Sequence, residues 1–263
     1  MSVRARLAAV TLRIRWAAVA ALAPRRSVTA NGLRLTLRTE NWITHYRWAT
    51  YAIKEPDTLR WLDRVVRDGD VVFDVGANIG VYSLYAALRH PRAVVLAFEP
   101  EYANLHLLRD NVVANGLRDR VTIYALALGD RVGLTHLQVQ DLTPGSALHT
   151  ESPVPIDHTR TGRRVVMREG IALMTLDEFC ALRSLVPNAI KIDVDGTEAE
   201  ILRGAERTLR DPALRTVLIE LPVSVGAASE CRARLEDAGL GPTPMDVGEG
   251  TNEVWTRRSH RGW

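Results

Sequence analysis

The chain has 263 residues, of which 46% are hydrophobic and 25% are charged, the balance of a folded protein with room for one α/β domain and terminal additions. Its two cysteines, Cys180 and Cys231, exclude a disulfide framework and a cysteine-based zinc site, and they suit a reducing, cytoplasmic compartment. Residues 1–60 hold 11 basic and 3 acidic side chains, whereas residues 61–254 hold 20 basic and 28 acidic ones. An acidic body repels a phosphate backbone, so nucleic acid is not an expected partner.

Residues 1–30 are predicted to form a basic, apolar helical segment. Their longest uncharged run, Trp16–Pro24, has nine residues, whereas a membrane-spanning helix needs roughly 20. A signal peptide fits poorly because Arg13 and Arg15 interrupt the apolar region. Two interpretations stay open: a helix packed on the domain or on a partner chain, and a peripheral contact of residues 1–26 with the inner face of the membrane.

The following residues divide into an extension or cap over 31–60 and a main domain over 61–258. From residue 61 onward, short β-branched runs alternate with helical patterns, which predicts a doubly wound α/β sheet. The runs are apolar throughout, as in parallel strands that helices cover on both faces. The predicted strands are Val71–Asp74, Val94–Glu99, Val121–Leu126, Ala189–Asp193 and Val217–Leu221.

The end of the chain and one internal stretch depart from this alternation. Thr243–Val247 and Glu253–Arg257 flank a glycine-rich turn and predict a closing antiparallel hairpin. Strands predicted at Leu134–Val139 and Val165–Arg168 flank an irregular insertion, Asp141–Gly162. A long irregular insertion in a compact domain is often functional, so we expect substrate contacts there.

The first predicted strand delivers Asp74 into a turn that contains Gly76 and Gly80 and leads into a helix. Glycines permit a close backbone approach, and a helix N-terminus offers free N–H groups to an anion. A dinucleotide fingerprint would need glycine where the chain has Asn78, which disfavours a nicotinamide oxidoreductase. Asp74 can instead contact the amino group of a methionine moiety. Glu99, 19 residues after Gly80, can bind two ribose hydroxyls.

Three charged residues, Lys191, Asp193 and Asp195, alternate along the fourth predicted strand and therefore share one side of it. Buried charges on a central strand are costly, but they are reasonable where strand ends open into the ligand crevice of such a sheet. We take all three as candidate catalytic residues. A structural ion pair between Lys191 and an aspartate stays open, as does an Asp-x-Asp metal site of the glycosyltransferase type, which the upstream loop does not fit.

Four histidines are candidate general bases by residue type: His106, His136, His149 and His158. His106 lies on a predicted helix, where a surface or packing role is expected. His149 and His158 lie in the irregular insertion, where a base could reach an acceptor hydroxyl.

An ordered series of motifs resembles the FkbM family of methyltransferases over about residues 55–220. The motifs are Val72–Gly80, Phe98–Pro100, Ala127–Asp130, Thr175–Glu178 and Lys191–Gly196 with Glu198 and Gly204. The resemblance implies a class I methyltransferase fold, which is Rossmann-like, with a seven-stranded sheet whose last strand is antiparallel. It also implies S-adenosylmethionine as donor and usually a hydroxyl acceptor on a sugar or another small natural product.

The resemblance also implies roles for individual residues. Those that would bind the cofactor are Asp74, Gly76, Asn78, Gly80 and Glu99. Those that would line the crevice near the transferred methyl group are Asp193, Asp195 and Glu198, and we count Glu198 with the cofactor-binding candidates as well. The family usually has glutamate where this chain has Asp195, so the carboxylate oxygens lie about one methylene closer to the backbone.

The function expected from the sequence is therefore methylation of an oxygen on a small molecule, with Asp193 or Asp195 as base or as orienting group. Either could act directly or through a divalent metal, which the sequence does not establish. Two alternatives stay open: a scaffold protein that binds the cofactor without catalysis, and an RNA methyltransferase that uses the basic termini.

Overall fold

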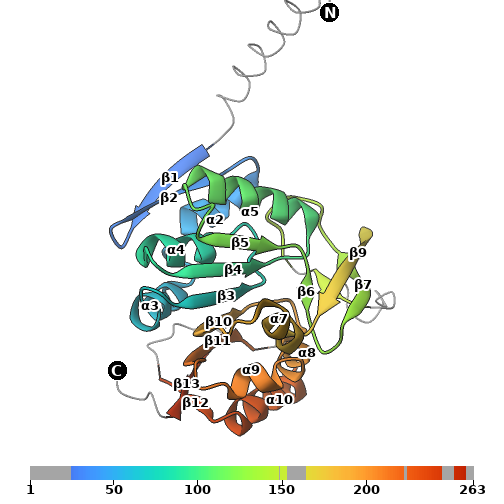
Figure 1. Cartoon of the computed structure of the whole chain (residues 1–263). Coiled ribbons are helices and arrows are strands. Elements are labelled where there is room, and N and C mark those ends of the chain that lie inside the picture. Colours follow the sequence, from blue (N-terminus) through green and yellow to red (C-terminus); the bar gives the residue numbers. More distant parts are fainter. Residues whose placement is uncertain (1–24, 148, 153–163, 222–223, 245–251, 259–263) are drawn as a thin grey trace, which may run out of the picture.

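The structure is a computed structural model that describes residues 25–147, 149–152, 164–221, 224–244 and 252–258 (Figure 1). Its centre is a seven-stranded sheet in the order β12-β13-β11-β10-β3-β4-β5. The strands are β12 (Leu240–Pro242), β13 (Asn252–Arg257), β11 (Thr216–Glu220), β10 (Ala189–Ile192), β3 (Val71–Val75), β4 (Val94–Phe98) and β5 (Val121–Tyr124). Strand β13 runs antiparallel to both neighbours and the other pairs are parallel. The predicted fold class and the five predicted parallel strands are confirmed.

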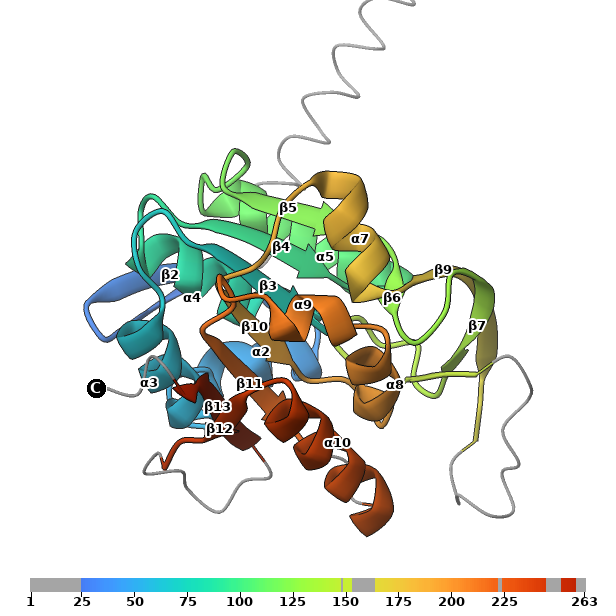
Figure 2. The ribbon, with the colours of Figure 1, turned by 60° about the horizontal axis from the view of Figure 1, so that its bottom comes forward.

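Helices cover both faces of this sheet. Val72 and Leu218 point to one face, whereas the neighbouring residues Phe73 and Val217 point to the other, and all four are buried. The first face is covered by α3 (Pro56–Val65), α4 (Val81–Arg89) and α5 (Tyr102–Ala114). The second is covered by α7 (Leu176–Arg183), α8 (Glu198–Arg203), α9 (Glu206–Arg210) and α10 (Val225–Asp237), seen on the near side of the sheet in Figure 2. Two apolar layers of this kind explain why the strands carry no polar alternation.

The N-terminal part of the structure is a hairpin of β1 (Arg25–Ala30) and β2 (Leu33–Arg38), followed by α2 (Trp42–Thr50). The helical prediction for residues 1–30 is therefore wrong over Arg25–Ala30, which is a strand, and residues 1–24 lie outside the described part. Leu35 and Leu37 are buried in the same core as α4 and α5. The predicted cap thus shares its core with the main domain.

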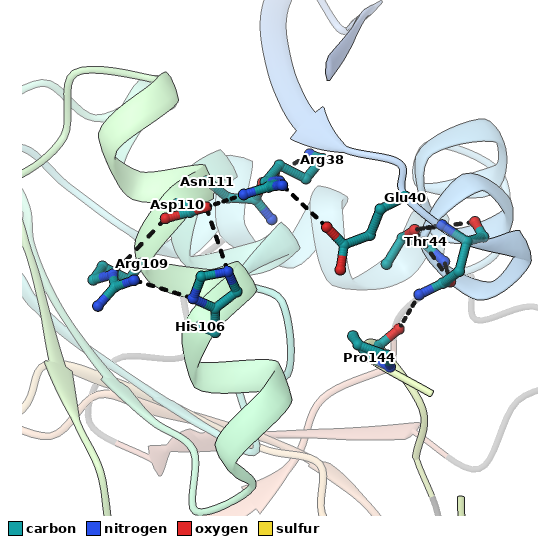
Figure 3. A network of polar contacts seen from close by, with 9 residues as sticks. Arg38, Glu40, Thr44, His106, Arg109, Asp110, Asn111 and Pro144 are labelled. Atoms are coloured by element: carbon teal, nitrogen blue, oxygen red, sulfur yellow. Dashed lines mark hydrogen bonds and ion pairs between the residues drawn. The ribbon is translucent and has the colours of Figure 1, made fainter. Parts of the chain in front are cut away.

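Polar contacts also fasten this cap to α5 (Figure 3). The guanidinium of Arg38 pairs with Asp110, and its second terminal nitrogen lies 3.2 Å from Glu40. The backbone N–H of Arg38 donates to Asn111 at 2.8 Å. His106, a candidate base by type, lies beside Asp110 on the exposed side of α5, in a surface network.

A smaller sheet lies beside the main one, in the order β6-β9-β7-β8. Its strands are β6 (Ala127–Leu128), β9 (Met167–Met174), β7 (Gly133–Val139) and β8 (Thr150–Glu151). The prediction of a strand at Leu134–Val139 is confirmed, whereas the strand predicted at Val165–Arg168 begins two residues later and is longer. His136 lies on β7 and pairs with Gly170 across the sheet.

The closing hairpin differs from its prediction in one arm. Its first strand is β12, which ends at Pro242, rather than Thr243–Val247; Pro244 lacks the N–H that a paired strand needs. Residues 245–251 lie outside the described part. Within the ranges that the structure describes, no helix has both the length and the apolar character to cross a membrane.

Candidate active site

A cleft of about 320 Å³ opens at the carboxyl ends of β3, β4, β10 and β11. This is the edge where parallel α/β sheets bind their ligands. The main domain contributes the loop after β3, Glu99 and the turn after β10, and the cap contributes Arg47, Lys54 and Glu55. The sequence did not predict that the cap reaches the cleft.

The loop after β3 adopts backbone conformations that favour glycine. Gly76 and Gly80 have φ values of 78° and 88°, and Asn78 between them has 50°. A Cβ on Gly76 would lie 2.0 Å from the carbonyl oxygen of Asp193, and one on Gly80 would lie 2.3 Å from Leu108. The loop therefore passes directly against the end of β10, which no side chain at position 76 would allow.

Asp74 supports this loop from beneath. One carboxylate oxygen accepts a hydrogen bond from the Ser83 hydroxyl at 2.5 Å. The other has no hydrogen-bond partner among the described residues and lies 3.7 Å from the Lys191 ammonium. Burial raises the pKa of Asp74, although Lys191 opposes the shift. Asp74 is not among the residues that line the cleft, so its direct contact with a ligand amine stays a prediction.

Glu99 lies at the end of β4 with its carboxylate in the cleft. Its Oε2 accepts the Asn78 N–H at 2.8 Å, and its Oε1 accepts the Glu101 N–H at 2.9 Å. Burial raises the pKa of Glu99 to about 7, against these two hydrogen bonds. The Asn104 side chain is a further hydrogen-bond partner of this carboxylate. The predicted contact of Glu99 with a ribose stays a prediction.

Lys191 and Asp193 form an ion pair at the floor of the cleft. The Lys191 ammonium lies 2.7 Å from Asp193 Oδ2 and 5.0 Å from the ring centre of Tyr82. Burial acts to lower the pKa of Lys191, but Asp193 and Asp74 outweigh it and raise the pKa to about 12. Burial acts to raise the pKa of Asp193, but the Lys191 charge and the hydrogen bonds with Glu220 and Lys191 together lower it to about 2. Asp193 is therefore both the ion-pair partner of Lys191 and a carboxylate that lines the cleft.

Asp195 is held by the loop that contains His149. The backbone N–H of His149 donates to Asp195 Oδ2 at 3.1 Å. The His149 Nδ1 accepts the Gln140 N–H at 3.4 Å, and its Nε2 lies 3.0 Å from Ser146 Oγ. Ser146 Oγ donates its own proton to the backbone carbonyl of Asp141. It must therefore accept a hydrogen bond from the Nε2–H of His149, whose ring is then neutral. Burial lowers the pKa of His149, which favours the neutral ring. Both ring nitrogens are already engaged in hydrogen bonds, so the predicted base role loses support.

Two asparagines, of which Asn104 is buried and Asn78 half-buried, and one arginine hold the loop before His149 against the cleft. Asn104 accepts the Gly145 N–H at 2.7 Å and donates to the Ser146 carbonyl at 3.2 Å. Asn78 donates to the same carbonyl at 2.7 Å. Arg47 donates through Nε to the Gly145 carbonyl at 2.7 Å. The side chain of Asn78 is therefore directed at this loop, and its predicted part in cofactor binding would be indirect.

The same loop is fastened to the start of α2. Asn41 caps that helix by accepting the Thr44 N–H at 2.9 Å, and its amide nitrogen donates to the Pro144 carbonyl at 2.8 Å (Figure 3). The sequence analysis predicted substrate contacts in the stretch that contains this loop, and Ser146, Ala147 and His149 line the cleft, but it did not predict the bonds that hold the loop there. The signal was a Pro-Gly-Ser turn inside the irregular insertion, with asparagine on two neighbouring elements.

Glu198 lies behind the cleft and does not line it. Its Oε1 accepts the Gly196 N–H at 3.2 Å, and its Oε2 has no hydrogen-bond partner among the described residues. Burial raises the pKa of Glu198 to about 7. Its predicted contact with the cofactor stays a prediction.

Two further candidates from the sequence were His158 and a divalent metal. His158 lies outside the described residues. Within the described part of the chain, no group of three or more histidine, cysteine, aspartate or glutamate side chains is arranged to hold a metal ion. The divalent metal considered from the sequence therefore stays a prediction with no ligand group assigned.

The cleft fits S-adenosylmethionine in two respects. The glycine-containing turn after β3 brings its backbone into the lining of the cleft, and Glu99 offers a carboxylate to a diol. With the sheet order and its antiparallel β13, these features define a class I methyltransferase that depends on S-adenosylmethionine.

Sequence comparison gives the family. The methyltransferase FkbM domain matches residues 74–239, and the chain belongs to this family. The match starts at Asp74, so the cap lies before it. Family membership confirms the resemblance seen in the sequence and supports an enzyme over a scaffold that binds the cofactor without catalysis.

Two relatives and one solved structure are similar to this chain. The 31-O-demethyl-FK506 methyltransferase FkbM of Streptomyces tacrolimicus is 31% identical over 218 residues, which cover 74% of this chain and 83% of that protein. The hexuronic acid methyltransferase AglP of Haloferax volcanii is 29% identical over 175 residues, covering 65% and 64%. The crystal structure of M. jannaschii TYW2 in complex with AdoMet is 12% identical with a TM-score of 0.45, covering 89% and 86%.

Proposed function

We propose that the protein transfers a methyl group from S-adenosylmethionine to a hydroxyl of a sugar or another small natural product. The observation that carries this proposal is the set of carboxylates around the open side of the cleft: Glu55, Asp193, Asp195 and Glu220. Carboxylate oxygens accept hydrogen bonds, so this lining suits a ligand with several hydroxyl donors. Two relatives, a 31-O-demethyl-FK506 methyltransferase and a hexuronic acid methyltransferase, support the same class of acceptor.

The chain's own residues would bind and orient both substrates. Glu99 and the Gly76 turn would hold the cofactor, which when bound supplies a methyl group on a positively charged sulfur. Lys191 keeps Asp193 ionised, so Asp193 can accept the hydrogen bond of an acceptor hydroxyl and fix the direction of its oxygen. A pKa of about 2 makes Asp193 a poor proton acceptor. Asp195, fixed by the His149 N–H, is our candidate for receiving the proton.

A mass-spectrometric screen tests the proposal. The full chain is incubated with S-adenosylmethionine and a library of sugars and small metabolites, and products heavier by one CH₂ are sought. We expect a methyl ether of a hydroxyl compound. Products methylated on nitrogen or carbon alone would contradict the proposed acceptor class.

Two substitutions in the best acceptor assay then separate the carboxylates. Asp193→Asn should lower turnover at saturating substrates, because the amide can no longer be held as an anion by Lys191. Asp195→Asn should flatten the rise of turnover with pH if Asp195 receives the proton. Full turnover in Asp193→Asn would remove Asp193 from the mechanism.

We also propose a cytoplasmic location, with residues 1–26 as a peripheral contact to the membrane. The support is chemical: Cys180 and Cys231 are free and buried, and the first 26 residues carry six arginines and no acidic side chain. Deletion of residues 1–24 should lower binding of the full chain to anionic vesicles. Unchanged binding would refute this contact.

A further inference from the structure

The outward face of α2 is apolar, the reverse of an ordinary surface helix. Trp42 is 75% exposed and Tyr46 is 43% exposed, one helical turn apart. Ala49 is exposed on the same face, and Ile53, just after the helix, is 73% exposed. The spacing i, i+4 and i+7 places Trp42, Tyr46 and Ala49 along one face of the helix, and Ile53 follows its end. We call these four residues the α2 stripe.

Ring contacts connect the α2 stripe to the β1–β2 hairpin. The rings of Trp42 and His45 lie 6.2 Å apart, and those of His45 and Trp48 lie 5.2 Å apart. The guanidinium of Arg26 on β1 lies 5.6 Å from the ring centre of Trp48. The apolar stripe and the basic strand therefore belong to one continuous surface.

The hairpin carries uncompensated positive charge. Arg25, Arg26 and Arg34 are exposed, and none of them has an ion pair with another described residue. The basic groups nearer the main domain are neutralised instead, as Lys54 is by Glu55 at 2.9 Å. An exposed aromatic stripe beside free arginines matches one kind of partner, a surface with negative charge outside and apolar material just beneath.

We propose that the α2 stripe and the arginines of the β1–β2 hairpin bind the surface of an anionic lipid bilayer. Trp and Tyr are the side chains favoured at the level of the lipid head groups, and arginine is attracted to anionic lipid. A second copy of the chain fits less well, because each copy would bring its own basic hairpin to the contact. This contact is independent of the proposed methyl transfer, and apart from Arg25 and Arg26 it uses residues outside 1–26.

The contact would also determine where the reaction cleft lies relative to the bilayer. Arg47 lies on the same short helix, and its guanidinium lines the cleft and bonds the Gly145 carbonyl. A bilayer that holds α2 therefore holds the rim of the cleft close to its surface.

Vesicle co-sedimentation of the full chain tests the proposal, with equimolar phosphatidylglycerol and phosphatidylcholine compared against pure phosphatidylcholine. The wild type should bind the anionic vesicles, and binding should weaken with salt. The variant Trp42→Ser/Tyr46→Ser/Ile53→Ser should bind roughly tenfold more weakly. A control, Leu134→Ser/Leu182→Ser/Val225→Ser, removes equally exposed apolar side chains elsewhere and should bind like the wild type.

Three results would overturn the proposal. The wild type could fail to bind anionic vesicles, or the α2 variant could bind as tightly as the wild type, which would leave residues 1–24 as the contact. Light scattering could also show that the wild type is a dimer and the α2 variant a monomer, which would make the stripe an interface between copies. A thermal shift with S-adenosylhomocysteine, equal in both variants, shows that each remains folded.

Quenching of tryptophan fluorescence tests the contact without the triple variant. Brominated phosphatidylglycerol quenches the fluorescence of tryptophans that lie near its acyl chains. We expect quenching of the wild type and weaker quenching of Trp42→Phe at equal vesicle binding. Equal quenching of the two proteins would place Trp42 away from the bilayer and refute the contact.

Discussion

Replacing Gly76 with alanine tests the contact between the cofactor loop and the end of β10. The new Cβ would lie 2.0 Å from the Asp193 carbonyl oxygen and 2.9 Å from its carbonyl carbon. Both are backbone atoms that cannot rotate away, so the loop or the strand end must move. We expect a loss of folding stability together with a displaced cofactor loop.

The magnitude has two parts. Gly76 has a φ of 78°, and a left-handed conformation costs an alanine about 1–2 kcal/mol. The overlap with β10 adds about 1–3 kcal/mol, as in overpacked cores. Gly116 separates the two, because its φ is 69° and a Cβ there meets nothing within 4 Å. Gly116→Ala should therefore carry the conformational cost alone.

Urea unfolding followed by circular dichroism measures both variants, and calorimetry with S-adenosylhomocysteine measures the loop. Gly76→Ala should be less stable than Gly116→Ala by about 1–3 kcal/mol and should bind the ligand at least about tenfold more weakly. Equal stability of the two variants would show that the loop does not press against β10. Unchanged ligand binding in Gly76→Ala would show that this loop does not hold the cofactor.

Three further predictions concern single side chains. The pKa of Glu99 is about 7 in the free protein, and hydroxyl donors favour its anion, so binding of S-adenosylhomocysteine should release a proton and tighten from pH 6 to 8. Glu99→Gln should give a flat pH profile of binding. The raised pKa also means that Glu99 makes folding stability fall as pH rises from about 4.5 to about 7. Lys191→Met leaves two carboxylates without their cation and should cost about 3–5 kcal/mol in urea unfolding; a loss below about 1 kcal/mol would contradict the ion pair. Asn104→Ala removes the bonds to the cleft loop and should cost about 2 kcal/mol with weaker ligand binding, whereas Asn115→Ala, which breaks similar bonds to Thr36 away from the cleft, should leave binding unchanged.

The sequence predicted what depends on local patterns. The parallel strands follow from short β-branched runs, and the Asp74–Gly80 loop follows from glycine spacing between a strand and a helix. Side-chain direction does not follow from such patterns. Asp74 turns to Ser83, and Asn78 turns to Ser146, because the rotamer of a loop residue depends on partners that are distant in sequence.

Two features show the same limit at a helix start and at the cleft. The spacing of Thr197 and Glu200 is typical of a capping box, but Thr197 makes no side-chain cap, because its φ of −112° and ψ of 22° are not the extended conformation that a capping residue needs. Lys54 and Glu55 reach the cleft only because α2 folds back over the main domain. No spacing within residues 31–60 indicates that return.

The position of β13 has a consequence for folding during synthesis. Strand β13 lies between β11 and β12 and is made of Asn252–Arg257, close to the end of the chain. Until a ribosome releases these residues, the edge of β11 is unpaired and β12 lacks the neighbour it pairs with. Arg257 then also donates to the carbonyls of Leu209, Asp211 and Leu214. A nascent chain should therefore stay sensitive to proteases, and to edge-to-edge association, until Asn252–Arg257 have left the ribosome.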